Sequence, residues 1–523
     1  MKRSHLATAL LLFATLSACH DSNDNNAGGS GPSTTNPASF TSTYKKEACS
    51  NILPTQIAAE FKSAKLECGF ITVPANWTVP DGDTISLAVY RLPSTSAKPA
   101  PDPVIYLEGG PGGAGISTLE DFAIGPASYL RERSDVVVVD QRGTGYSRPA
   151  LYCREVFQAE KEDGDIAAAH KACHDRLVTK GINLADYTSH NNALDINAVP
   201  KAMGYTEWNL YGLSYGTRLA LTVMRDAAEG VRSVVLDSVF PPQVNGLSEA
   251  SYPRYWSMEQ IARNCEADTA CRATGIDLKT QIEQGIERLA ANPVTLPDGT
   301  RFATSEYLGI LGDAIANPEV GDVIMTIANG TDDDISQLTK ELLSDENEEE
   351  AIDLTNERVI PIYPFVADVA QGMASAVVCA EEWPYPEHKV SPDLASHFSQ
   401  TTQQAVNKMV ASDQSYQCNS WDIPAAGLLE TQAVNSDIPT LVLAGTADIA
   451  TPPEWGRIAD KTLSRSQYTE FPDLTHGVLG VNDCVNTLTR RFLDNPETKL
   501  DQSCIAGLPK VSYFGETDNQ NQP

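Results

Sequence analysis

The sequence contains one serine whose neighbours suit nucleophilic catalysis. Ser214 lies in the motif Gly212-Leu213-Ser214-Tyr215-Gly216, between an apolar run typical of a strand and a pattern typical of a helix. In such a turn the serine takes a strained backbone conformation, and the flanking glycines let neighbouring backbone approach closely. The motif therefore predicts that Ser214 is a nucleophile. The alternative is an ordinary strand-to-helix turn.

A serine hydroxyl needs a base, and this arrangement uses a histidine later in the chain. Three histidines follow Ser214, and two of them, His388 and His397, lie near prolines or on a helical pattern. His476 follows the last strand pattern, in "FPDLTHGVLG". We therefore expect His476 to be the general base.

The histidine in turn needs an acid, and two aspartates stand at the ends of apolar runs. Asp448 follows "IPTLVLAGTA", at the carboxyl end of an expected parallel strand, where α/β sheets assemble their sites. Asp237 ends the earlier run "VRSVVLD", which supplies the acid in some arrangements of this kind. We expect Asp448 to orient His476 and retain Asp237 as the alternative, whereas Asp473 is expected in a loop.

The glycine-rich stretch "EGGPGGAG" admits two kinds of chemistry. Gly110, Gly112 and Gly115 have the spacing of a dinucleotide-binding loop, and Asp140 ends a second apolar run about where a ribose-binding acid would stand. That interpretation leaves the serine, histidine and aspartate described above without a role. It also requires a nicotinamide cofactor to reach a protein with the pattern of an export signal.

The same loop can instead complete an acyl-transfer site. Such a site needs two backbone N–H groups aimed at the developing oxyanion, one of them from the residue after the serine, here Tyr215. The second comes from a loop after an earlier strand; Pro111 has no N–H, so Gly109 or Gly110 is the expected donor. We therefore expect an oxyanion hole, with no cofactor and no metal.

These side chains require a sheet that presents several strand ends at one edge. "FITVPANWTV" and "TISLAVYRLP" alternate as paired strands do, and four apolar runs follow, separated by stretches long enough for helices. Continuous apolar strands that alternate with helices predict an α/β fold with a mostly parallel sheet covered on both faces. A later stretch rich in helical patterns predicts a helical cap inserted into this core.

The chain divides accordingly into six expected parts. They are a signal peptide (1–18), a flexible tether (19–45), the first part of the core (46–244), the helical cap (245–427), the C-terminal part of the core (428–510) and a polar tail (511–523).

The N-terminus carries the pattern of a bacterial export signal. Lys2 and Arg3 precede an apolar run that is too short to span a bilayer. The run ends in "LSAC", which resembles a lipobox, so we expect cleavage before Cys19, acylation of this cysteine and anchoring to a membrane, in the periplasm or at the cell surface. The alternative is a plain secretory signal with an incidental cysteine.

The other ten cysteines predict disulfide bonds, because an even number in an exported chain is typical of such a framework. Neighbours along the chain give the expected pairs Cys49/Cys68, Cys153/Cys173, Cys265/Cys271, Cys379/Cys418 and Cys484/Cys504.

The formal net charge of −31 argues against nucleic acid as a partner. The acidic clusters are expected to be solvated surface that keeps the protein soluble. No pattern in the sequence indicates an oligomeric state.

Five motifs occur in one order along the chain: "GGPGG", "DQRGTGYS", "GLSYG", "GTADIATPP" and "THG". With them, residues 46 to 510 resemble the proline iminopeptidase and tripeptidyl aminopeptidase group of serine peptidases, within the α/β-hydrolase superfamily. "DQRGTGYSRP" is the most specific element, since the spacing of the catalytic residues alone would admit any lipase or esterase. The cysteine pairs and "VVCAEEW" resemble the secreted tripeptidyl aminopeptidase branch.

The resemblance implies an α/β-hydrolase fold and removal of residues from the free N-termini of peptide substrates. It implies the same serine, aspartate and histidine as above, with Gly110 and Tyr215 as oxyanion donors. Glu381 and Glu382, in "VVCAEEW", become candidates for binding the ammonium group of the substrate. Glu108 departs from the histidine that intracellular proline iminopeptidases place there, which argues against strict proline specificity.

Three alternatives stay open. An esterase would use the same catalytic residues, and a catalytically silent, membrane-tethered binding protein would use none of them. In "DQRGTGYS", Gln141, Arg142 and Gly143 are expected to brace the loop, with a substrate carboxylate as the alternative partner of Arg142.

Overall fold

The structure, a computed structural model, describes residues 40–162, 164–343, 369–412 and 417–514. The predicted signal peptide, Cys19 and the tether up to residue 39 lie outside the described residues. The first strand begins at Thr43, inside the stretch expected as tether.

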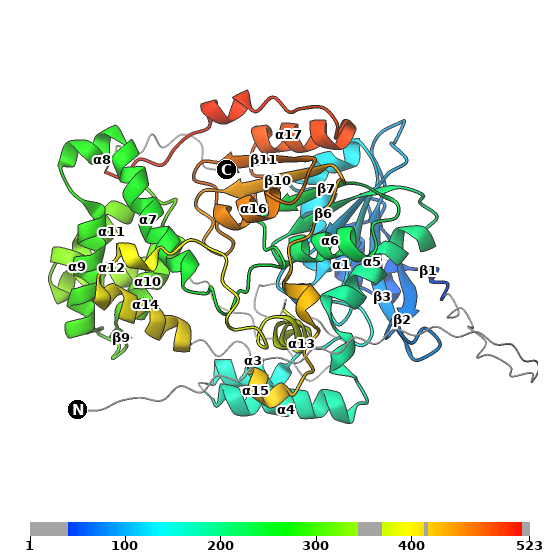
Figure 1. The fold of residues 1–523 in the computed structure, drawn as a ribbon, viewed down its shortest axis with the longest axis horizontal. Helices are drawn as coiled ribbons and strands as arrows, with labels where there is room; N and C mark the ends of the chain where they lie inside the picture. Colours follow the sequence, from blue (N-terminus) through cyan, green and yellow to red (C-terminus); the bar gives the residue numbers. More distant parts are fainter. Residues whose placement is uncertain (1–39, 163, 344–368, 413–416, 515–523) are drawn as a thin grey trace, which may run out of the picture. The chain divides into compact units, whose positions relative to one another are not determined.

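Nine strands form one sheet (Figure 1). In sheet order they are β1 (Thr43–Glu47), β2 (Glu67–Pro74), β3 (Thr84–Leu92), β5 (Val136–Val139), β4 (Val104–Leu107), β6 (Trp208–Leu213), β7 (Val231–Asp237), β10 (Thr440–Gly445) and β11 (Ser466–Phe471). In this sheet order, neighbouring strands from β5 through β4, β6, β7 and β10 to β11 pair in parallel. At the other edge, β1, β2 and β3 form antiparallel pairs, and β3 pairs antiparallel with β5. The expected mostly parallel sheet is confirmed.

The helices fall into two groups along the chain. Those before β7 or after β10 are α1 (Thr55–Glu60), α2 (Leu119–Ala123), α3 (Arg154–Lys161), α4 (Ile166–Thr179), α5 (Ser189–Ala202), α6 (Tyr215–Asp226), α16 (Pro453–Asp460) and α17 (Asp483–Asp494). Those between β7 and β10 are α7 (Tyr252–Ala267), α8 (Thr269–Thr274), α9 (Leu278–Ala291), α10 (Thr304–Asp313), α11 (Val320–Asn329), α12 (Asp332–Leu343), α13 (Gln371–Glu381), α14 (Gln400–Ser412) and α15 (Cys418–Trp421), with a short hairpin of β8 (Val294–Thr295) and β9 (Arg301–Phe302).

The parallel strands are buried on both faces because their side chains alternate between two hydrophobic cores. Val137 and Val139 of β5 share a core with residues of α5 and α6, whereas Val136 and Val138 share another with residues of α2 and α17. All four valines are fully buried. Burial on both sides explains why the sequence shows an unbroken apolar run here instead of alternation.

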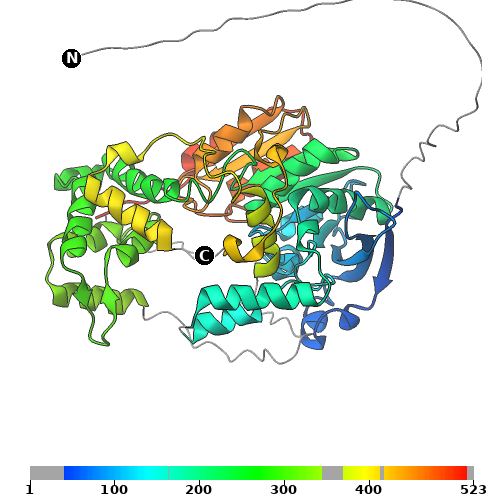
Figure 2. The same ribbon diagram turned by 60° about the horizontal axis from the view of Figure 1, so that its bottom comes forward.

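A separate hydrophobic core lies among most of the helices between β7 and β10. Met258 of α7, Ile282 of α9 and Leu311 of α10 are fully buried in it, and Figures 1 and 2 draw α7 to α12 and α14 as one group. This group contacts the rest of the fold at several places: Trp455 of α16 is part of its core, and Asn264 Nδ2 of α7 donates to Asp473 Oδ1 at 3.1 Å. The expected helical cap, inserted between two strands of the sheet, is present.

Unlike the other helices of this stretch except α15, α13 packs in the main core. Met373 and Val377 are fully buried in the same cluster as residues of β4, β5 and β6, and a disulfide joins Cys379 at its end to Cys418 of α15. The helical patterns and the scarcity of strand signals led us to expect the whole of 245–427 in the cap, whereas side-chain packing places α13 and α15 with the main core.

The five cysteine pairs expected from the sequence are all disulfide bonds: Cys49–Cys68, Cys153–Cys173, Cys265–Cys271, Cys379–Cys418 and Cys484–Cys504. Because disulfides persist in oxidising compartments, this framework indicates an extracytoplasmic protein. Within the described ranges, every helix is too short or too polar to cross a bilayer.

The disulfides are expected to contribute unequally to stability. Cys379 and Cys418 are 39 residues apart, whereas Cys265 and Cys271 are 6 apart. Since a longer closed loop restricts the unfolded chain more, replacing the first pair by alanines should lower the free energy of unfolding by about 1.5 kcal/mol more than replacing the second. Chemical denaturation of the two double variants measures this difference, and equal losses would contradict it.

Candidate active site

Ser214 stands between β6 and α6 in the strained conformation expected of a nucleophile elbow. Its φ of 56° and ψ of −124° lie in a region that few non-glycine residues adopt. A Cβ on Gly216 would overlap the carbonyl oxygen of Leu107, and one on Gly212 would overlap that of Gly216. The two glycines are therefore required by the close approach of β4, β6 and α6 at this turn.

His476 and Asp448 form a hydrogen-bonded pair. His476 Nδ1 lies 3.0 Å from each carboxylate oxygen of Asp448, which stands in the loop after β10. Asp448 is fully buried, and it also accepts bonds from the amides of Ala450, at 2.9 Å, and Thr451, at 2.8 Å. Of the two aspartates considered as the acid, Asp448 is thus the one that contacts the histidine.

The pair is polarised as a general base requires. Burial alone would lower the pKa of His476, but the adjacent Asp448 carboxylate outweighs it and holds the histidine pKa above its usual 6.5. Burial alone would raise the pKa of Asp448, but His476 and hydrogen bonds from Thr451 bring it below its usual value. Asp448 is therefore ionised wherever His476 is neutral.

The histidine loop lies against the serine turn. A Cβ on Gly477 would be 3.3 Å from Leu213 Cδ1, so the residue after His476 contacts the residue before Ser214. Nδ1 of the histidine faces Asp448, which leaves Nε2 as the nitrogen available for a proton from the serine.

The glycine loop after β4 lies directly beside the serine. A Cβ on Gly109 would be 2.8 Å from Ser214 Cβ, and Gly110 has a φ of 112°. The N–H of Gly109 donates to Glu108 Oε1 at 2.8 Å, so this amide is directed to a carboxylate. Of the two candidates for the second oxyanion donor, Gly109 is therefore already engaged, and Gly110 remains the expected donor together with Tyr215 at the start of α6.

The comparisons with known proteins agree with this geometry. A family model described as the alpha/beta hydrolase fold matches residues 102–280, which include the serine turn. A second, for TAP-like proteins, matches residues 403–504, which include Asp448 and His476. The chain has the α/β-hydrolase fold. The match to the TAP-like model supports the resemblance to the tripeptidyl aminopeptidase group that was stated from the motifs.

Three curated relatives illustrate the range of similar proteins. Serine protease Hip1 of Mycobacterium tuberculosis is 30% identical over 253 residues, 45% of this chain and 48% of that protein. Tripeptidyl aminopeptidase of Streptomyces lividans is 32% identical over 205 residues, 35% of this chain and 37% of that protein. Carboxylesterase B of M. tuberculosis is 26% identical over 252 residues, 45% of this chain and 46% of that protein. The chain thus spans about half the length of these relatives, or less.

The motif "DQRGTGYS" braces the glycine loop after β4, as expected for Gln141. Asp140 is fully buried and accepts bonds from the amides of Ile116, at 2.9 Å, and Tyr146, at 2.7 Å. Gln141 Nε2 donates to the carbonyl oxygen of Glu108 at 2.7 Å. A carboxylate enclosed in this way cannot bind a ribose, so Asp140 does not support the dinucleotide interpretation.

Arg142 is a structural residue. Its side chain is fully enclosed, and Nε lies 2.8 Å from Asp195 Oδ2. Its Nη1 donates to the carbonyl oxygens of Ala75 and Asp186, at 2.7 and 2.6 Å. The alternative role, contact with a substrate carboxylate, finds no support in this position.

The two glutamates at the end of α13 point to different partners. Glu381 is buried and accepts bonds from the amide and hydroxyl of Ser189, at 2.6 and 2.8 Å; this hydroxyl lies 2.9 Å from Tyr215 Oη. Glu382 forms a buried ion pair with Arg218, at 2.7 Å. Of the two predicted ammonium-binding residues, Glu382 thus has its charge neutralised within the fold, and Glu381 is linked to the residue after the nucleophile.

Burial raises the pKa of Glu381 to about 7, and the charge of Glu430 adds to this effect. Among the described residues Glu381 forms no ion pair. Its carboxyl group therefore titrates in the neutral range.

Two contacts of the site were not expected from the sequence. Thr451 Oγ1 lies 2.8 Å from Asp448 Oδ2 and 3.2 Å from His476 Nδ1. An aspartate followed three residues later by threonine after a strand is typical of a local side-chain turn, and this spacing was the available signal. Ser189, which connects Glu381 to Tyr215, lies at the start of a helix and has no comparable signal.

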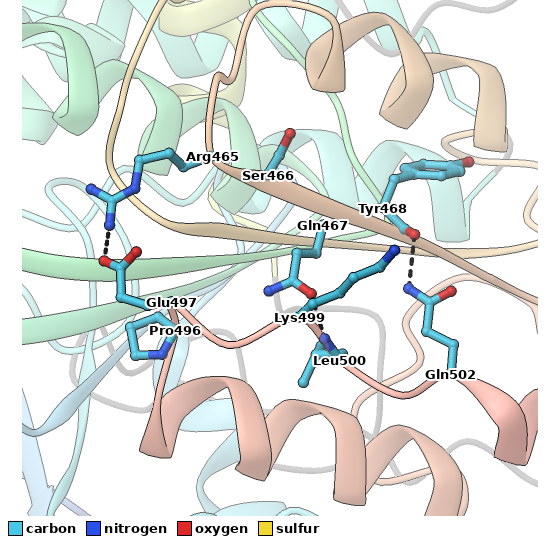
Figure 3. A pocket seen from close by; sticks show the side chains of 9 residues that line it. All are labelled: Arg465, Ser466, Gln467, Tyr468, Pro496, Glu497, Lys499, Leu500 and Gln502. Carbon is cyan, nitrogen blue, oxygen red and sulfur yellow. Dashed lines mark hydrogen bonds and ion pairs between the residues drawn. The ribbon is translucent and has the colours of Figure 1, made fainter.

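Two other polar sites are explained by contacts within the protein. The cavity of about 650 Å³ in Figure 3 lies at β11 and the segment after α17. Several of its polar side chains are already bonded: Arg465 pairs with Glu497, and Gln502 Nε2 donates to the carbonyl oxygen of Tyr468 at 3.1 Å. Its polar lining therefore stabilises the local fold.

The other site brings His190, Asp226 and Glu430 together, with potential metal-ligand atoms within 4.8 Å of one another. The guanidinium of Arg225 lies 2.7 Å from Asp226 and 2.9 Å from Glu430. It thus occupies the place of a cation between the carboxylates, and the cluster is an ion-pair network.

The elbow geometry predicts that a fluorophosphonate labels Ser214 covalently. Ser214→Ala should abolish labelling and reduce turnover to the small residual rate that binding and an oxyanion hole supply. Mass spectrometry of the labelled peptide identifies the modified residue. Stoichiometric labelling at another residue, together with full activity of the alanine variant, would contradict the assignment.

The His476–Asp448 pair predicts a defined pH dependence. Because His476 must be neutral to accept a proton and its pKa is raised, the labelling rate should increase with pH through a midpoint above 6.5. Asp448→Asn removes the charge that raises this pKa, so it should lower the midpoint and reduce the rate by roughly 10³–10⁴-fold. A midpoint unchanged in this variant would exclude Asp448 as the partner of the base.

Proposed function

We propose that this protein is a serine hydrolase that cleaves residues or short peptides from the free N-termini of peptides. The observation that carries the proposal is the hydrogen-bonded pair of Asp448 and His476 in the loop that contacts the serine turn. The relatives named serine protease and tripeptidyl aminopeptidase support a peptide as the substrate class.

In the first half of the reaction, Ser214 Oγ attacks the carbonyl carbon of the scissile bond while His476 Nε2 takes its proton. The resulting imidazolium is stabilised by Asp448, which stays ionised because its pKa is lowered. Negative charge develops on the carbonyl oxygen, and the amides of Gly110 and Tyr215 supply the donors for it. These donors need no rearrangement, since the glycine loop is fixed by its own contacts.

In the second half, the tetrahedral intermediate collapses to an acyl-enzyme and the C–N bond breaks. The leaving amine takes the proton from His476 and departs as the shortened peptide. Water then enters, His476 accepts its proton, and attack on the ester releases the N-terminal fragment and restores Ser214. The net reaction is hydrolysis, and the protein's own residues supply every proton transfer.

Recognition of the free N-terminus is assigned to Glu381. This carboxyl group is buried and connects through Ser189 to Tyr215, the neighbour of the nucleophile. A charged hydrogen bond to a substrate ammonium would offset the cost of burying the carboxylate. Glu382 serves this proposal indirectly, by fixing the end of α13 through its ion pair with Arg218.

The second candidate function is ester hydrolysis. The similarity to a protein named carboxylesterase B favours it, because the same serine, histidine and aspartate would serve an ester. The two functions differ in the leaving group and in the need for a free amine.

The membrane anchor is part of the proposal as well. An acyl group on Cys19 would attach the protein to a membrane in the periplasm or at the cell surface, where its disulfides are stable. Peptides in that compartment would then be the accessible substrates.

A substrate panel tests the proposal. Peptidyl amides with a free N-terminus should exceed their acetylated counterparts by tenfold or more in kcat/KM, given about 1.5–3 kcal/mol for a charged hydrogen bond. Short acyl esters serve as the third arm of the panel. Equal turnover of free and blocked peptides, or esters preferred by orders of magnitude over amides, would favour the esterase.

Glu381→Gln should reduce this preference for a free amine while simple esters react nearly as before. The preference itself should increase with pH as Glu381 ionises near its pKa of about 7, and decrease when the substrate amine loses its proton at about 8. Glu382→Gln is the matched control, because it adjoins Glu381 and should lower thermal stability instead. An amine preference lost only in the control would contradict the assignment.

A further inference from the structure

We propose that Asp237 is a positioning residue, which fixes the loop of His476 relative to Ser214 and keeps a second negative charge near the histidine. The proposal rests on the proposed serine–histidine–aspartate mechanism. It gives a different role to the aspartate that the sequence offered as the alternative acid.

The carboxylate of Asp237 binds the backbone that follows His476. Asp237 ends β7 and is fully buried, and it forms no ion pair among the described residues. The amide of Val478 lies 3.0 and 3.1 Å from its two oxygens, and the amide of Leu479 lies 3.0 Å from Oδ2. Tyr211 Oη donates to Oδ2 at 2.8 Å, and Ser238 Oγ donates to Oδ1 at 3.4 Å.

The next residue extends this contact. The amide of Gly477 donates to Ser238 Oγ at 2.8 Å, so three consecutive amides after His476 are held by Asp237 and Ser238. Ser238 has a φ of 57°, a conformation that costs free energy and that the surrounding contacts must maintain. A loop held at three successive amides has little freedom to shift its histidine.

The main chain of Asp237 also contacts the main chain of Ser214. The amide of Ser214 donates to the carbonyl oxygen of Asp237 at 3.0 Å. Asp237 thus contacts the serine through its main chain and the histidine loop through its side chain. The separation of Ser214 and His476 is set through one residue, which makes no direct bond to either reacting group.

Several titratable groups interact with His476 and Asp237. His476 is faced by the carboxylates of Asp448, Asp237 and Glu108, and each favours its protonated form. Asp237 is faced by His476 and by buried tyrosines, Tyr211 among them, whose pKa values burial raises, so they stay neutral.

Burial raises the pKa of Asp237 to about 6, although the bonds from Val478 and Tyr211 oppose the shift. Above that pH Asp237 carries a negative charge. The protonated form would lose the acceptor capacity that the loop amides need.

Asp237→Asn tests the proposal. The amide has nearly the same shape, but it removes the charge and places N–H donors against the loop amides. The rate of fluorophosphonate labelling at Ser214 should fall by about tenfold to 10²-fold, as a small misplacement of reacting groups predicts. The midpoint of the pH–rate profile should also move to lower pH, because His476 loses one of its carboxylate neighbours.

Asp140→Asn is the matched control. Asp140 is likewise buried, bonded to a tyrosine, Tyr90, and to two backbone amides, but it braces the oxyanion loop and is not among the carboxylates that face His476. Its substitution should slow labelling without moving the midpoint. A midpoint that moves equally in both variants, or in neither, would overturn the role of Asp237.

Ser238→Ala keeps the test decisive if Asp237→Asn does not fold. It removes the acceptor of the Gly477 amide and a long hydrogen bond to Asp237, but no charge, so labelling should slow several-fold at an unchanged midpoint. Labelling at the wild-type rate would overturn the positioning role. Failure of the wild-type protein to be labelled at Ser214 would instead reject the proposed function, so the two failures are distinguishable.

Discussion

A buried carboxylate without a cationic partner is costly, and two aspartates of this kind hold loops of the candidate site. Asp140 and Asp237 are fully buried, and neither forms an ion pair within the described part of the chain. Each is bonded to one tyrosine hydroxyl and to backbone amides of loops at the site. Moving either loop would leave a buried charge unsatisfied. The positions of the catalytic loops are therefore a condition of the stability of the core.

The sequence predicted those parts of the molecule that depend on local pattern. The turn at Ser214 needs glycines on both sides, because the backbone of β4 lies against Gly216 and that of α6 lies against Gly212, and the five-residue motif shows this need. The order of serine, aspartate and histidine follows from the strand that each one ends. The unbroken apolar run of β5 likewise indicates burial on both faces.

Other parts depend on contacts between distant segments and could not be predicted. The choice between Asp448 and Asp237 required knowing which carboxylate reaches His476. The choice between Gly109 and Gly110 depended on the side chain of Glu108, which accepts a hydrogen bond from the amide of Gly109. Adjacent residues at a helix end point about 100° apart, which is why Glu381 and Glu382 have unrelated partners. The sequence shows such neighbours as equivalent.

α13 connects two features of the site that lie far apart in the chain. Just before its first turn, the amide of Ala370 donates to the carbonyl oxygen of Gly112 in the oxyanion loop, at 2.9 Å. Its last residue is Glu381, and a disulfide at Cys379 holds that end. The helix is thus a rigid connection between the glycine loop and Glu381. One inserted residue would turn its far end by about 100° and advance it by about 1.5 Å, so the spacing between the two ends changes only in coarse steps. The spacing between the glycine loop and Glu381 is therefore more readily altered by changing the length of α13 than by exchanging side chains along it.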